Sequence, residues 1–128
     1  MKLLLLACAG GAIGAGARYL ANVAISSLLG ASFPFATMFV NVLGSFLMGT
    51  VYVLVAERLG GSVEWRVFLA VGVLGGFTTF SAFSADVMNL MLQEGGLNPA
   101  VVVYVLGSVT FAIAAIYAGV SFMRAVLT

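Results

Sequence analysis

Four long apolar stretches, separated by short polar connections, limit how this chain can fold. They cover residues 3–29, 35–56, 65–92 and 101–123. Each reaches the roughly 20 residues that a helix needs to cross about 30 Å of hydrocarbon, and the connections carry the Gly, Pro, Asn and charged residues typical of turns. We therefore predict an all-α membrane protein, a single domain over residues 1–128 with four transmembrane helices in the lipid bilayer.

The composition supports this assignment and excludes several function classes. Hydrophobic residues make up 63% of the 128 residues and charged residues 7%, whereas soluble domains carry about 25% charged residues. A net charge of +1 offers no basic surface to nucleic acid. The chain has no histidine, so a catalytic serine would lack a base and a catalytic metal would lack ligands. We expect neither an enzyme nor a partner of nucleic acid.

The third stretch is interrupted near its middle by the run Gly-Gly-Phe-Thr-Thr-Phe-Ser-Ala-Phe, residues 75–83. Two glycines and several hydroxyls replace aliphatic residues there, which predicts a helix break at membrane depth. Hydrocarbon supplies no water to backbone N–H and C=O groups, so non-helical backbone survives only where it is packed in protein or lines a polar cavity. This run is the first candidate for a functional site.

Two other stretches carry narrow polar stripes. Polar or small residues recur every four positions at Thr37, Asn41, Ser45 and Gly49, and again at Tyr104, Ser108 and Ala112. Residues at this spacing share one face of a helix. Such stripes form either hydrogen bonds between helices or the wall of a pore, and the sequence leaves both open.

Small residues in the first stretch predict close helix packing. Gly10 and Gly14 are four residues apart, a spacing that lets a neighbouring backbone approach. Four helices with bulky apolar side chains leave little room for a solvated path inside one subunit. We therefore expect an oligomer, and closed symmetric dimers are the commonest solution.

The distribution of basic residues bears on orientation. An even number of helices places both termini on one side of the membrane. That side would also receive Lys2, Arg58, Arg66 and Arg124, against Arg18 towards the other side. The positive-inside rule then favours cytoplasmic termini.

The polar groups inside the predicted spans are mostly neutral and suit a small ion. The acidic residues are Glu57, Glu64, Asp86 and Glu94, and only Asp86 lies near membrane depth, which weakens a proton-coupled mechanism. A broken helix exposes carbonyls on one half and N–H groups on the other, sites for a cation and an anion. Aromatic rings at positions 80 and 83 share one helix face. Their positive edges can contact an anion, or the rings can pack at a helix interface.

Residues 72–84, which read GVLGGFTTFSAFS, resemble the signature of the Fluc (CrcB) fluoride channels, a family of small four-helix membrane proteins. Three further motifs support the resemblance. The first stretch carries Gly10-Gly11-Ala12-Ile13-Gly14 leading to Arg18-Tyr19, and the second carries Thr37-Met38-Phe39-Val40-Asn41-Val42-Leu43-Gly44. The fourth carries Tyr104 and Ser108. The likeness spans essentially the whole chain. It implies an antiparallel, dual-topology homodimer in the bacterial inner membrane, although the basic residues favour one orientation.

The resemblance also implies roles for individual residues. The backbone carbonyls of Gly75 and Thr78, from both subunits, would hold a central structural Na⁺. Phe80 and Phe83 would form an aromatic box along the fluoride path, and Asn41 would contribute its amide to the pore wall.

Further residues receive weaker assignments from the same resemblance. Ser81, Tyr104 and Ser108 are expected as polar pore lining or a constriction. Arg18 matches an arginine near a vestibule, although it can also snorkel to the interface or pair with Asp86.

The expected function is that of a fluoride-selective passive anion channel. Such a channel exports cytoplasmic fluoride down its gradient and so lowers its toxicity. Two alternatives remain. A small four-helix drug or metabolite exporter would normally need an acidic residue in the first helix, and this chain has none there. A structural membrane-assembly protein explains the glycines but not the hydroxyl and phenylalanine cluster.

Overall fold

The computed structural model describes residues 1–93 and 95–128, so Glu94 lies outside the described residues. In chain order the elements are α1 (Lys2–Leu29), α2 (Phe35–Glu57), α3 (Val63–Arg66), the π-helical η1 (Val67–Leu74), α4 (Gly75–Phe77), α5 (Phe80–Gln93) and α6 (Pro99–Leu127). The elements α3 to α5 form one interrupted span, Val63–Gln93. With α1, α2 and α6 this makes, among the described residues, four helices long and apolar enough to cross a membrane, which confirms the predicted fold class.

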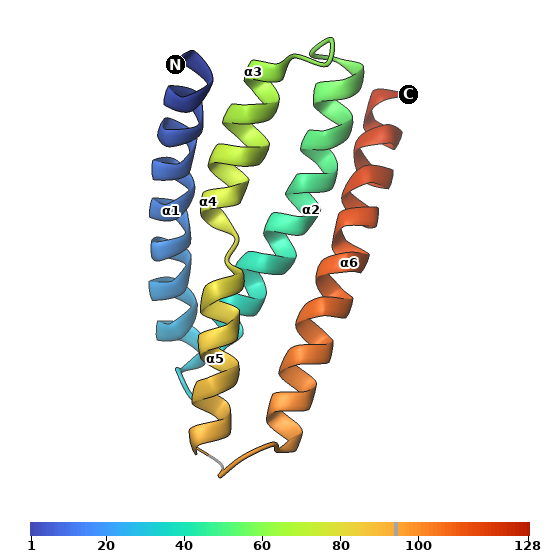
Figure 1. The fold of residues 1–128 in the computed structure, drawn as a ribbon. Coiled ribbons are helices and arrows are strands. Elements are labelled where there is room, and N and C mark those ends of the chain that lie inside the picture. Colours follow the sequence, from blue (N-terminus) through green and yellow to red (C-terminus); the bar gives the residue numbers. More distant parts are fainter. Residues whose placement is uncertain (94) are drawn as a thin grey trace.

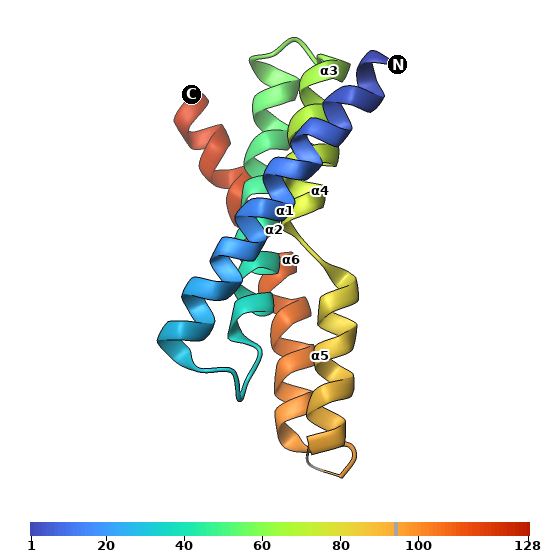
Figure 2. The same ribbon diagram turned by 90° about the vertical axis from the view of Figure 1, so that its left-hand side faces the viewer.

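The spans run side by side, and both termini lie at the same end of the bundle (Figure 1). At this end the Nη2 of Arg58 donates a hydrogen bond to the carbonyl of Leu127 at 3.1 Å. The most extensive contacts join α2 to α6, and α1 to η1 and α4. Below the break, α5 packs mainly on α6 and diverges from the C-terminal half of α1 (Figure 2).

Glycines bring α1 against the upper part of the third span, as their spacing predicted. A Cβ added to Gly10 would lie 2.9 Å from the Cα of Gly72, and one added to Gly76 would lie 2.6 Å from the carbonyl oxygen of Gly11. A Cβ at Gly14 would overlap the carbonyl oxygen of Val73. No side chain fits at these positions, so the two backbones touch directly.

A second glycine contact joins α2 to α6. A Cβ at Gly49 would overlap the carbonyl oxygen of Ile116, and a Cβ at Gly119 would overlap that of Phe46. Gly49 belongs to the predicted polar stripe, but its role in the structure is packing. Close packing of small residues is the main source of affinity between helices in lipid, where apolar side chains gain little by leaving the bilayer.

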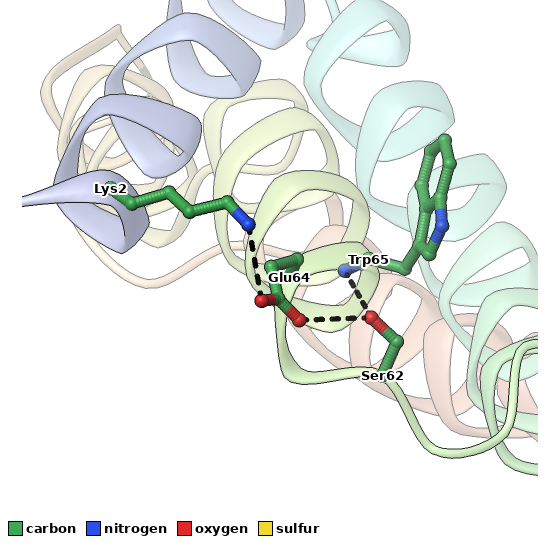
Figure 3. A network of polar contacts seen from close by, with 4 residues as sticks. All are labelled: Lys2, Ser62, Glu64 and Trp65. Carbon is green, nitrogen blue, oxygen red and sulfur yellow. Dashed lines mark hydrogen bonds and ion pairs between the residues drawn. The ribbon is translucent and has the colours of Figure 1, made fainter.

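The start of the third span is fixed by a small polar network (Figure 3). The hydroxyl of Ser62 caps α3 by accepting the N–H of Trp65 at 3.4 Å, and it donates to a carboxylate oxygen of Glu64 at 3.2 Å. The other oxygen of Glu64 pairs with the Nζ of Lys2 at 3.3 Å. Both partners of this ion pair are largely exposed, so water and salt screen their attraction and the pair contributes little to stability.

Candidate functional site

The break in the third span is two residues long. Helix α4 ends at Phe77, α5 begins at Phe80, and Thr78 is extended with φ −79° and ψ 157°. The Thr78 N–H and Oγ1 both donate to the carbonyl of Leu74, each at 2.9 Å. These two bonds cap the C-terminal end of α4. The break is narrower than the run that predicted it, because both glycines of that run remain helical and Gly76 serves packing against α1 instead.

The side chain of Asn41, on α2, binds the backbone of Thr79 on both sides. Its Nδ2 donates to the carbonyl of Thr79 at 3.0 Å, and its Oδ1 accepts the N–H of Thr79 at 2.7 Å. These are backbone groups that the break removes from the helical ladder, and unpaired groups of this kind are costly in the membrane. A side-chain amide carries two N–H donors, so Asn41 retains one for another acceptor.

The side chain of Thr79 caps the N-terminal end of α5. Its Oγ1 accepts the N–H of Ala82 at 3.1 Å, which is the usual N-cap arrangement, and lies 3.2 Å from the hydroxyl of Ser81. The sequence showed Thr79 as one of several hydroxyls but did not single it out. The sequence feature that could have identified it is a threonine placed three residues before Ala82 at the start of a helix, which is the spacing of an N-cap.

These contacts leave two carbonyl oxygens without their usual donors. In an α-helix the carbonyls of Gly75 and Thr78 would accept from the amides four residues on. Those amides belong to Thr79 and Ala82, which donate to Asn41 and to the Thr79 hydroxyl instead. The structure therefore presents both oxygens as acceptors at the break, and these are the two that the family resemblance implies as ligands of a cation.

A groove of about 300 Å³ runs beside the break. We call it the polar groove, and it is lined by Asn41, Gly44, Ser45 and Met48 of α2, Thr78 and Thr79 of the break, Phe80 and Phe83 of α5, and Ser108, Val109, Ala112 and Ile116 of α6. It brings the predicted Asn41, Phe80, Phe83 and Ser108 together from three helices. Ser108 is 5% exposed, and its hydroxyl has no hydrogen-bond partner among the described residues. The wall thus holds an unused donor.

A row of aromatic rings lies along this part of α5 and α6. The rings of Phe80 and Phe83 are 5.4 Å apart, and Phe83 lies 5.3 Å from the ring of Tyr104. Phe80 is 78% exposed at the outer side of the groove. The two phenylalanines therefore share one face, as their spacing predicted.

Tyr104 lies deeper than its predicted place in the pore lining. It is fully buried, and its hydroxyl donates to Oδ2 of Asp86 at 3.0 Å. The sequence offered Arg18 as one partner for Asp86, but within residues 1–93 and 95–128 the ion pair found joins Lys2 to Glu64 instead. Arg18 is half-buried on α1 and does not line the polar groove, and neither does Ser81.

Fold and site together define the class of protein. The chain is a multi-pass membrane protein in which a broken helix places neutral donors and carbonyl oxygens at membrane depth. In the part of the chain that the structure describes, no group of three or more His, Cys, Asp or Glu side chains could hold a metal.

Comparisons with known proteins give the family. Residues 5–120 match the family described as CrcB-like protein, Camphor Resistance (CrcB), so the chain belongs to the CrcB family. A relative from Chelativorans sp. (strain BNC1), named fluoride-specific ion channel FluC, is 48% identical over 97% of this chain and 98% of its own. Relatives with the same name from Agrobacterium fabrum and Rhizobium meliloti are 48% and 44% identical, over 93% and 99% of this chain and 94% and 100% of their own.

Family and fold together settle the location and the broad class of activity. The protein is a multi-pass protein of the bacterial inner membrane. It is a membrane channel-family protein and not an enzyme.

Proposed function

We propose that this protein is a fluoride-selective, passive anion channel that works as an antiparallel homodimer and exports cytoplasmic fluoride. One observation carries the proposal. The polar groove gathers the Asn41 amide, the unpaired Ser108 hydroxyl and the rings of Phe80 and Phe83 beside a helix break, in a chain whose relatives are named fluoride-specific ion channels.

The chemistry of the groove suits fluoride. This ion is small and strongly hydrated, so a path must replace its water with donors at close range. The free N–H of Asn41 and the hydroxyl of Ser108 are such donors, and the ring edges of Phe80 and Phe83 add weaker positive contacts. Chloride is larger and meets these donors at unsuitable distances, which favours fluoride.

A second copy of the chain would complete the path. The polar groove is open on one side, and Phe80 at its outer side is mostly exposed. Closed two-fold dimers present the same surface from both subunits, so a second copy would cover both grooves at once. An antiparallel arrangement places the two breaks at the same membrane depth.

The break also suits a structural Na⁺. The carbonyl oxygens of Gly75 and Thr78 lack their usual amide donors, and carbonyl oxygens are ligands for hard cations. Two copies would supply four such oxygens. Bound there, the ion would link the two subunits and add positive charge to the centre of the dimer.

Passive conduction is the simplest mode. Asp86, the acid nearest membrane depth, is engaged by Tyr104, and the groove is lined by neutral residues. In an acidic environment HF crosses membranes as a neutral acid and ionises in the cytoplasm. A passive fluoride path would then lower the cytoplasmic concentration without an energy source.

Fluoride efflux from liposomes tests the proposal. Purified protein is reconstituted, a potassium ionophore collapses the voltage, and a fluoride electrode records release, with chloride as the control ion. We expect rapid fluoride release and no chloride release. A folded dimer that releases no fluoride would contradict the proposal and favour the exporter or assembly alternatives.

The role of Na⁺ needs a separate measurement. Exchanging Na⁺ for N-methylglucamine should lower the thermal unfolding midpoint of the detergent-solubilised dimer, and returning Na⁺ should restore it. A midpoint that does not depend on Na⁺ would remove the ion from the proposal without affecting the channel itself.

A further inference from the structure

A second groove lies on the opposite side of the α2–α6 pair. It has a volume of about 780 Å³, and its walls include Ile25 and Leu29 of α1, Met38, Phe39 and Val42 of α2, and Ala115 of α6. We call it the apolar groove. Although both grooves lie on α2 and α6, they share no residue.

The helical repeat explains this separation. On α2, Asn41 and Ser45 line the polar groove, whereas Met38 and Val42, four residues apart, line the apolar groove. Figure 2 shows the same division in space, because α5 lies on one side of the molecule and the C-terminal end of α1 on the other. A subunit that covers the polar groove therefore leaves the apolar groove uncovered.

The position of the apolar groove determines what can fill it. Ala115 lies near the middle of α6, a helix long enough to span the membrane, so the groove faces the hydrocarbon layer. Its lining residues are all apolar, which leaves a polar ligand without partners. Its volume is within the roughly 300–1,000 Å³ of ordinary ligand sites.

We infer that the apolar groove is a binding site for one acyl chain of a membrane phospholipid. This inference rests on the proposed dimer, in which the second subunit occupies the opposite face. The side chain of Met38 is flexible and adapts to a ligand of irregular shape, and the rings of Phe39 and its neighbours offer flat apolar walls. Since no charged residue lines the groove, the site recognises the chain and not the headgroup.

Tryptophan quenching by brominated lipids tests this inference in the full-length dimer. Trp65→Phe removes the native tryptophan, and Phe39→Trp then places a reporter in the groove. Ile113→Trp, on the exposed side of α6 outside the groove, reports contact with ordinary surrounding lipid. Detergent-solubilised protein is titrated with phosphatidylcholine brominated on its acyl chains, and the titration is repeated with brominated phosphatidylglycerol.

We expect the tryptophan at position 39 to be half-quenched at a several-fold lower lipid-to-detergent ratio than the one at position 113, equally with both lipids. Ala115→Phe, which fills the groove, should remove that difference. Ala114→Phe, on the neighbouring position outside the groove, should preserve it. Equal quenching of the two reporters would overturn the inference in favour of ordinary surrounding lipid. Absence of quenching at position 39 alone would overturn it in favour of a second subunit on this face.

Fluoride efflux from the same preparations separates the two proposals. If fluoride efflux is observed and the two reporters are quenched equally, only the proposal of a lipid site is contradicted. If position 39 is quenched specifically but the dimer shows no efflux, only the proposal of a fluoride channel is contradicted.

Discussion

The side-chain amide of Asn41 binds both the N–H and the carbonyl of Thr79, although the two residues belong to different spans. A single side chain on α2 thus satisfies the backbone that the break exposes. The same contact engages the backbone N–H of Thr79, which in a continuous helix would donate to the carbonyl of Gly75. The residue expected in the pore wall therefore also maintains the break at which the cation site is proposed.

Asn41→Leu should loosen the break as well as remove a pore donor. Two hydrogen bonds are lost, each worth about 0.5–1.5 kcal/mol, and the Thr79 backbone is left unpaired. Amide hydrogen exchange of residues 79–82 should accelerate by roughly tenfold or more, since about 1.4 kcal/mol corresponds to tenfold. Ser45→Ala, at a groove position that makes none of the described hydrogen bonds, serves as control. Unchanged exchange in Asn41→Leu would show that the break is held by other contacts.

Thr79→Val should destabilise α5. The change keeps the shape of the side chain but removes the oxygen that accepts the N–H of Ala82, and loss of an N-cap costs about 0.5–2 kcal/mol. Thr79→Ser retains that oxygen and should stay close to the wild type. Unfolding in detergent measures both variants. Equal stability of the valine and serine variants would contradict the cap.

Tyr104 and Asp86 should be coupled energetically. Tyr104→Phe leaves the carboxylate of Asp86 without its donor and should cost about 1–3 kcal/mol. With Asp86→Asn already present, the same change should cost less, because no charged acceptor remains. A double-mutant cycle of unfolding free energies gives the coupling directly. Additive effects would mean that the 3.0 Å contact contributes nothing measurable.

Two glycines on α1 should respond differently to alanine. A Cβ at Gly14 would overlap the backbone of Val73, whereas one at Gly16 meets nothing within 4 Å. Gly14→Ala should therefore cost about 1–3 kcal/mol through overpacking, and Gly16→Ala should be neutral or slightly stabilising. Thermal unfolding of the two variants makes the comparison. A tolerated Gly14→Ala would contradict direct backbone contact between α1 and the third span.

Phe80→Ile and Phe83→Ile should each greatly reduce fluoride efflux while the dimer still assembles. Isoleucine keeps the apolar bulk but removes the ring edge that is proposed to contact fluoride. Efflux is measured in liposomes, and assembly by size-exclusion chromatography of the same samples. Efflux at the wild-type level in both variants would rule out the aromatic path.

The sequence predicted the fold because the bilayer imposes strict lengths on its helices. The four apolar stretches each correspond to one span in the structure, and the glycine spacing at positions 10 and 14 predicted the backbone contact of α1. The break was predicted too broadly, since glycine permits a break but does not require one. At Gly76 the absence of a side chain serves packing instead.

The partners of individual polar groups could not be predicted in the same way. The stripe from Thr37 to Ser45 was compatible with either helix contacts or a pore, and in the structure Asn41 both binds Thr79 and lines the groove. The pairing of Tyr104 with Asp86 depends on how α5 lies on α6 after the break. Such angles arise from packing between spans and leave no local pattern in the sequence.

The close pairing of α2 with α6 has a consequence for biosynthesis. The helix that carries Asn41 is made before the third span, whereas its partner α6, which packs against Gly49, is made after that span. At about 5–20 residues per second, α2 waits several seconds before Gly119 arrives. During this interval the nascent chain has one wall of the polar groove without the other. A truncation before α6 therefore yields an inserted but unfinished protein, and only synthesis of α6 lets the groove assemble.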